Sequence, residues 1–141
     1  MKRLFLLAVV PLLLISCEKE EILPLTEVSS VISNYTSTHF PDNPIIQSIK
    51  DTDGFELSYD IALKGGFFLE FNRKKEVIDI EGLSKLPDSA IPAKLLEYMP
   101  SNYPDNFIIG WELDDRNQQI KLENGLELEF NMNGVFLRID N

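Results

Sequence analysis

The sequence repeats itself, and this internal repeat constrains the fold more than any other feature. From Leu23-Pro24 to Ile45-Ile46, the equivalent residues recur 63 positions later, and from Ile61 to Ile80 they recur 59 positions later. The first copy therefore contains four additional residues, which lie between Asp51 and Asp60. Because a repeated supersecondary unit buries its apolar face against its neighbour, we expect two tandem units at residues 23–82 and 83–141.

Each copy predicts one helix followed by about four antiparallel strands. A proline and a capping residue precede an apolar stripe with helical spacing, and a second proline ends the helix. The positions concerned are Pro24, Thr26, Val28, Ile32, Tyr35 and Pro41, then Pro87, Asp88 or Ser89, Ile91, Leu95, Tyr98 and Pro104. Unbroken apolar alternation from Phe55 to Leu63 indicates a long strand.

The turns complete the expected architecture. Lys64-Gly65-Gly66 and Glu123-Asn124-Gly125 are predicted hairpin turns, and the second has the Asn-Gly pair that suits type I′. We therefore expect an α+β fold in which both helices lie on one face of a continuous antiparallel sheet of about eight strands. The opposite face of that sheet is expected to be open.

The N-terminus has the pattern of an export signal. Lys2 and Arg3 precede an apolar run at residues 4–15, which is too short to span a membrane and fits a secretory signal. The run ends in Leu14-Ile15-Ser16-Cys17, which resembles the bacterial lipobox, where cleavage precedes a cysteine that then carries lipid. We expect a signal peptide at residues 1–16; the alternative is a plain secretory signal with an incidental cysteine.

A charged tether is expected at residues 17–22, following the lipidated Cys17. Its acidic segment resembles the patch that sends some Gram-negative lipoproteins to the cell surface, and the alternative is a generic polar linker. These features place the expected protein in the cell envelope of a Gram-negative bacterium, on the periplasmic side or at the cell surface. A lipid anchor is its only expected contact with the membrane.

The repeat also resembles a known family. The second copy combines Leu86-Pro87, Tyr103-Pro104 and the segment LENGLELEFNMNGVF at residues 122–136. This ordered set is similar to the PepSY-like, β-lactamase-inhibitor-like domain, and the resemblance covers nearly all of the chain after the signal. The first copy departs from the pattern, because Lys75 replaces the turn glycine and Val77 the following aromatic residue. The resemblance implies tandem α+β units without catalytic residues that bind proteins or peptides, with inhibition as one outcome.

Composition and motifs argue against several activities. Thirteen Lys and Arg residues against 23 Asp and Glu residues give a net charge of -10, which disfavours nucleic acid as a partner. The single histidine, His39, is expected to cap a helix or lie on the surface. Asp51-Thr52-Asp53-Gly54 and Asp114-Asp115 lack the ligand spacing of a calcium loop. We expect no enzyme activity, metal or cofactor.

One short motif has two interpretations. Asp88-Ser89-Ala90 resembles an O-glycosylation sequon of some envelope bacteria, and a helix cap explains the same residues. The helix cap is the simpler explanation, because three-residue motifs are common by chance.

A candidate binding surface follows from strand alternation. Phe67, Leu69 and Phe71 share the parity of buried positions, which places Phe68 on the open face. The same argument predicts an apolar patch of Phe68, Val77 and Phe136 on that face, rimmed by Glu70, Glu127, Glu129 and Arg138. The alternatives are a terminal segment that covers this face and a bulge that shifts the parity. Trp111 is expected in the core.

These observations predict a non-enzymatic lipoprotein that binds an envelope protein or peptide through the open sheet face. The alternative is an accessory cell-surface module that binds a small ligand or glycan.

Overall fold

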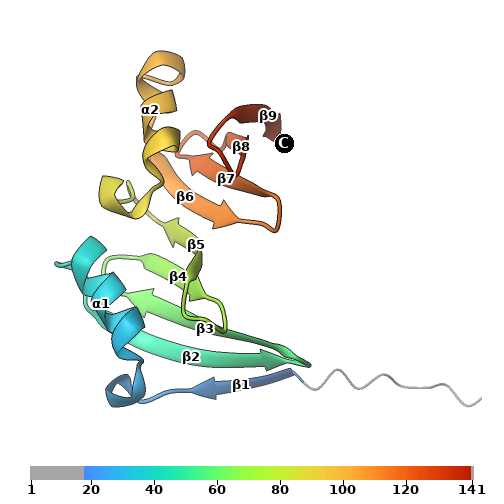
Figure 1. The fold of residues 1–141 in the computed structure, drawn as a ribbon. Helices are drawn as coiled ribbons and strands as arrows, with labels where there is room; N and C mark the ends of the chain where they lie inside the picture. The colour runs from blue at the N-terminus through green and yellow to red at the C-terminus, as the bar shows by residue number, and fades with distance from the viewer. Residues whose placement is uncertain (1–17, 141) are drawn as a thin grey trace, which may run out of the picture.

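The computed structural model describes residues 18–140, which form a nine-stranded antiparallel sheet in which every strand pairs with the next one in sequence (Figure 1). The strands are β1 (Glu18–Ile22), β2 (Ile45–Asp53), β3 (Glu56–Leu63), β4 (Phe67–Phe71), β5 (Val77–Gly82), β6 (Ile108–Leu113), β7 (Asn117–Leu122), β8 (Glu127–Asn131) and β9 (Phe136–Asp140). The α+β class and the continuous sheet are confirmed. The expected signal peptide and Cys17 lie outside the described residues.

Both helices begin later than the prolines suggest. Pro24 and Pro87 precede single 3-10 turns, η1 (Leu25–Glu27) and η2 (Asp88–Ala90), and the α-helices α1 (Ser30–His39) and α2 (Ala93–Asn102) follow. The Ser29 hydroxyl, rather than Thr26, caps α1 by accepting the Val31 N–H at 3.3 Å. No helix among residues 18–140 is long and apolar enough to cross a membrane.

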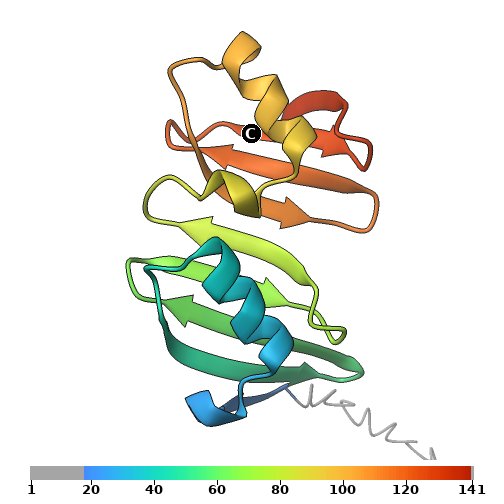
Figure 2. The same ribbon diagram turned by 60° about the vertical axis from the view of Figure 1, so that its left-hand side comes forward.

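The two helices cover the same face of the sheet, α1 over the first copy and α2 over the second (Figure 2). Equivalent edge-to-face ring pairs fasten each helix to its sheet: Tyr35 with Phe71 at 5.5 Å, and Tyr98 with Phe130 at 5.2 Å between centroids. The layer between helices and sheet is the core, in which Ile32, Ile61, Leu63, Leu69, Leu95, Ile120, Leu122 and Leu128 are at most 2% exposed. The order of one helix and four strands thus occurs twice.

Equivalent asparagines shape the last turn of each copy. Asn72 Oδ1 accepts the N–H groups of Lys74 and Glu76, and Asn131 Oδ1 accepts those of Asn133 and Val135, all at 2.9–3.0 Å. The turn then needs a residue in the left-handed region. Gly134 supplies it in the second copy with a φ of 77°. In the first copy Lys75 adopts it with a φ of 64°, the one positive φ among the described non-glycine residues.

The prediction of a type I′ turn at Asn124-Gly125 is wrong. Type I′ requires a positive φ at both central residues, whereas here Gly125 has a φ of 88° and Asn124 has no positive φ. The Gly125 N–H donates to the Leu122 carbonyl, and the Leu122 N–H donates to the Leu126 carbonyl, both at 2.9 Å. The loop is therefore a three-residue connection in which glycine takes the left-handed position after a tight turn.

The segment expected as a tether forms a strand from residue 18 onward. β1 pairs with β2 over five residue pairs, from Glu18 opposite Asp53 to Ile22 opposite Ile49. β1 pairs with β2, the first strand after α1, and β5 pairs in the same way with β6, the first strand after α2. The position of β1 at the sheet edge is therefore equivalent to the position of β5 at the junction of the two copies. Its charged side chains suit a sheet edge, because they discourage pairing with another chain.

Candidate binding face

The sheet has an open face on the side away from the helices, and five of the seven predicted binding residues lie on it. Leu69, Phe71, Leu128 and Phe130 are buried under the helices, so the intervening Phe68, Glu70, Glu127 and Glu129 point the other way. Arg138 is opposite Glu129 and shares its face. From the register, the open face includes Glu18, Glu20, Ile22, Gln47, Ile49, Asp51, Asp53, Glu56, Ser58, Asp60, Ala62, Phe68, Glu70, Asp79, Glu81, Glu112, Gln119, Lys121, Glu127, Glu129, Arg138 and Asp140.

Val77 and Phe136 lie on the helix side instead, so the predicted apolar patch does not form. Val77 is opposite Phe71, and Phe136 is opposite Phe130, both of which are fully buried core residues. Phe136 also stacks on Tyr98 of α2 at 5.1 Å. The reason is a register shift between Glu70 and Phe71 and its equivalent between Glu129 and Phe130, because one additional residue in a strand reverses the parity beyond it.

A row of four carboxylates crosses the open face. Asp60 on β3 is opposite Glu70 on β4, Glu70 is opposite Asp79 on β5, and Asp79 is opposite Glu112 on β6. We call these four residues the carboxylate row. Side chains directly opposite in a sheet have Cβ atoms about 4.5–5.5 Å apart, and like charges there are destabilising. The row therefore stores electrostatic repulsion across the junction of the two copies.

Burial and repulsion together raise the pKa of two carboxyls at the centre of the row. Asp79 is half-buried, and its pKa rises to about 7, first through burial and then through Glu81, Glu112, Glu70 and Asp60. Burial followed by the charge of Asp60 also raises the pKa of Glu70. Near neutral pH the centre of the row therefore holds a proton for part of the time.

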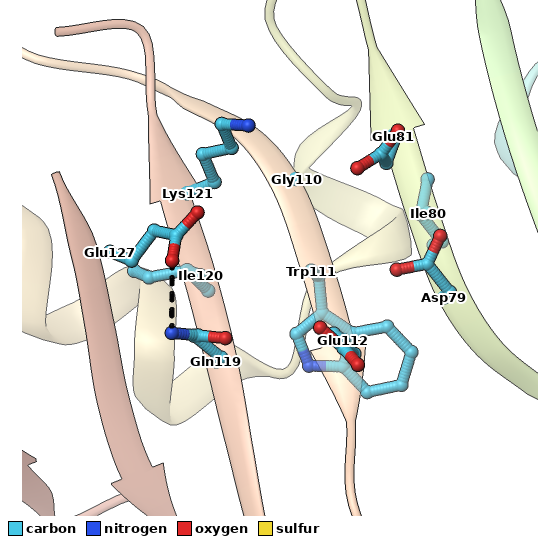
Figure 3. Close-up of a pocket in the computed structure, with 10 residues that line it drawn as sticks. All are labelled: Asp79, Ile80, Glu81, Gly110, Trp111, Glu112, Gln119, Ile120, Lys121 and Glu127. Carbon is cyan, nitrogen blue, oxygen red and sulfur yellow. Dashed lines mark hydrogen bonds between the residues drawn. The ribbon is translucent and has the colours of Figure 1, made fainter. Parts of the chain in front are cut away.

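The carboxylate row has no compensating ion pair within the described residues. In residues 18–140 the ion pairs are Lys85 with Asp88 and Arg138 with Glu129, and neither involves the row. Lys121 is opposite Glu127 on the open face. Figure 3 shows Asp79 and Glu81 projecting from β5 toward β6, around a shallow pocket of about 50 Å³ that Glu112 also lines.

The apolar part of the open face is small and lies beside the row. Phe68 is 50% exposed and is opposite Ala62. With Ile49 these side chains line a depression of about 230 Å³, whose rim includes Asp60, Glu70 and Asp79. An exposed aromatic ring bordered by carboxylates has the composition of an interaction surface.

The sequence-based argument did not include Asp60, Asp79 or Glu112 among the binding residues. Strand alternation places Asp60 and Asp79 on the open face, which was an available signal. Glu112 joins them only because β5 pairs with β6 across the junction of the two copies. Local periodicity contains no information about that pairing.

His39 and Trp111 lie away from the open face, and the acidic residues form no metal site within the described residues. His39 ends α1, where its Nδ1 is 3.0 Å from the Ser89 hydroxyl and its ring lies against Tyr35. Trp111 is confirmed as a core residue, 7% exposed, and its Nε1–H donates to Gln118 at 3.2 Å. Within the described part of the chain, no group of three or more His, Cys, Asp or Glu side chains could hold a metal ion.

Solved structures share this fold. A protein from Bacteroides vulgatus ATCC 8482 described as periplasmic is 30% identical with a TM-score of 0.80, covering 87% of this chain and 98% of that one. One from Bacteroides thetaiotaomicron, described as calcium-regulated and periplasmic, is 25% identical with a TM-score of 0.81, covering 86% and 97%. A third, also from Bacteroides vulgatus, described as periplasmic and of unknown function, is 27% identical with a TM-score of 0.81, covering 87% and 100%.

The family comparison agrees with the repeat. No curated protein matches the chain at a significant level. The model of the family described as beta-lactamase-inhibitor-like, PepSY-like matches twice, at residues 13–79 and 57–138. That description is of an inhibitor-like rather than a catalytic family. Together the two matches span most of the sequence, and the chain therefore belongs to the PepSY-like, beta-lactamase-inhibitor-like family.

Proposed function

We propose that this protein is a non-enzymatic envelope lipoprotein that binds a Lys- and Arg-rich segment of a protein or peptide through its open sheet face. The carboxylate row is the observation that carries this proposal. Four carboxylates in cross-strand succession repel one another, and the ion pairs of the described residues leave them uncompensated. A cationic partner would relieve that repulsion on binding, and Phe68 would supply an apolar contact beside it.

The proposal predicts that affinity depends on the charges of the row. Glu70→Gln/Glu112→Gln removes two of its charges, and Glu27→Gln/Glu97→Gln removes the same charge from exposed positions on the helix side. We expect the first pair to weaken binding of a fluorescent oligolysine peptide about fivefold in anisotropy titrations, and the control to leave it unchanged. Equal effects of the two pairs would contradict a role for the open face.

The salt and ligand dependence separates the alternatives. Because added salt shortens the Debye length, binding to the row should weaken steeply with NaCl. A neutral glycan, the alternative ligand, would lose affinity in Phe68→Ala but not in the Glu70/Glu112 variant. One structural neighbour is described as calcium-regulated. Peptide binding is therefore also measured in calcium chloride at the same ionic strength as the NaCl samples. Calcium that displaces the peptide better than matched NaCl would point to a divalent cation at the row.

We also propose that Cys17 carries a lipid anchor that holds the protein in the cell envelope. The apolar run and lipobox-like segment before Cys17 support this proposal, and the periplasmic descriptions of the structural neighbours support the location. Metabolic labelling with a fatty-acid analogue should mark the protein. Label that persists in Cys17→Ser would refute the anchor. If the bound partner is an envelope enzyme, docking over its active site would inhibit it.

A further inference from the structure

The first copy has a longer hairpin than the second. β2 and β3 contain nine and eight residues, whereas the equivalent β6 and β7 contain six each. Pairing continues to Asp53 opposite Glu56, which leaves Gly54-Phe55 as the tip. The additional residues of the first copy therefore lengthen this hairpin, and its tip projects beyond the turn between β4 and β5 (Figure 1).

The hairpin tip presents a free aromatic ring on a tethered backbone. Phe55 is 97% exposed, so almost none of its apolar surface is buried by folding. Its carbonyl accepts a hydrogen bond of 2.6 Å from Arg73 Nη2, which reaches across from the turn between β4 and β5. The tip is thus held at its backbone, while the ring remains available for contact with another molecule.

A cleft of about 760 Å³ lies beside this ring, at the end of the sheet where four hairpin turns gather. Apolar side chains from both copies line it, namely Phe55, Leu57, Ile78, Leu113 and Met132. Its lining also includes the acidic side chains of Glu56, Asp114 and Asp115, and it reaches the carboxylate row at Glu70. The depressions at Phe68 and at Gly110 are much smaller, about 230 and 50 Å³.

We propose that this cleft receives an apolar side chain of the partner polypeptide, flanked by Lys or Arg residues. The five apolar side chains suit that side chain. The lining also has seven acidic residues against one basic residue, Arg73, and this excess of negative charge suits the Lys or Arg residues on either side. The volume lies within the usual range of ligand pockets, about 300–1,000 Å³. This inference rests on the proposed function, because the basic residues of the same segment would continue onto the carboxylate row through Glu70.

Two peptides test the cleft separately from the row. One alternates Lys with Leu, and the other alternates Lys with Ser, so they differ in apolar content but not in charge. Phe55→Ala removes the exposed ring, and Val31→Ala, at a 54% exposed position on α1, is the matched control. Met132→Ser, at a 54% exposed lining position in the second copy, is a second cleft variant. All of them are exposed positions, where truncation leaves the core intact.

We expect Phe55→Ala to weaken the Lys/Leu peptide about tenfold, Met132→Ser to weaken it in the same direction, and neither to affect the Lys/Ser peptide. Val31→Ala should bind both peptides like the parent protein. The cleft assignment is overturned if both cleft variants bind the Lys/Leu peptide with the affinity of the parent protein. If Glu70→Gln/Glu112→Gln at the same time binds both peptides more weakly, the proposed function still stands. If the charge variant also binds both peptides normally, the proposed function fails as well.

Discussion

Replacing Asp79 by Asn should stabilise this protein at alkaline pH and have little effect at acidic pH. Asn has nearly the same shape as a protonated Asp but cannot ionise. The pKa of Asp79 rises from 3.8 to about 7, because the side chain is half-buried and four carboxylates, Glu81, Glu112, Glu70 and Asp60, surround it. The folded state therefore binds this proton more tightly than the unfolded state, and stability is lost as the pH rises from about 4 through about 7.

The size of the effect follows from that shift in pKa. A full shift to about 7 would correspond to at most about 4 kcal/mol of unfolding free energy. The carboxyl of Asp79 is only half-buried, and solvent screening reduces this to about 1–2 kcal/mol. For a domain of this size, we expect Asp79→Asn to raise the melting temperature at pH 8 by about 3–8 °C. At pH 5 the gain should be clearly smaller, because the folded protein still holds the Asp79 proton and only the part of the loss between about pH 4 and 5 has occurred.

Thermal unfolding followed by circular dichroism at pH 5 and pH 8 checks this expectation. Glu97→Gln is the matched control, because it removes the same charge from the exposed side of α2. Its melting temperature relative to the parent should not change with pH in this way. The reasoning is refuted if Asp79→Asn gives no gain at pH 8, or the same gain at both pH values, since neither result is compatible with a titrating carboxyl in the row.

The glycine turns allow two further predictions, both measured as free energies of unfolding in urea. Gly125→Ala should lower the free energy of unfolding by about 1 kcal/mol, because Gly125 has a φ of 88° and no atom lies within 4 Å of the new Cβ. Gly134→Ala should lower it by about 2–4 kcal/mol, because the new Cβ would lie 2.6 Å from the Lys94 Cβ. Equal costs would contradict that contact. Lys75→Gly should stabilise the protein by about 0.5–1 kcal/mol, because it relieves a left-handed lysine; a loss of stability would show that the lysine side chain compensates its backbone.

Several features of the fold could be predicted from the sequence because they depend on near neighbours. Helical spacing identified Ile32 and Leu95 as core residues, and strand alternation identified Leu69 and Leu128. Proline positions gave the helix ends correctly but not their beginnings, because a 3-10 turn after Pro24 or Pro87 meets the same local preferences as a first helical turn.

The candidate site was only partly predictable for a related reason. Alternation placed Phe68, Glu70, Glu127, Glu129 and Arg138 on the open face correctly. It failed at Val77 and Phe136, which are separated by a bulge from Asp79 and Arg138 in the last strand of each copy. A bulge adds one residue without a distinctive sequence, and every side chain beyond it changes face.

The sequence by itself determined the repeat, the kinds and order of elements in each copy, and most of the core, since these follow from spacings within a few residues of one another. Only the tertiary structure decided that β1 joins β2, that Phe136 packs under α2, and that Asp79 on β5 faces Glu112 on β6. The physical reason is that register and strand pairing are settled by packing between distant segments. The carboxylate row, which spans the junction of the two copies, exists only after that pairing has formed.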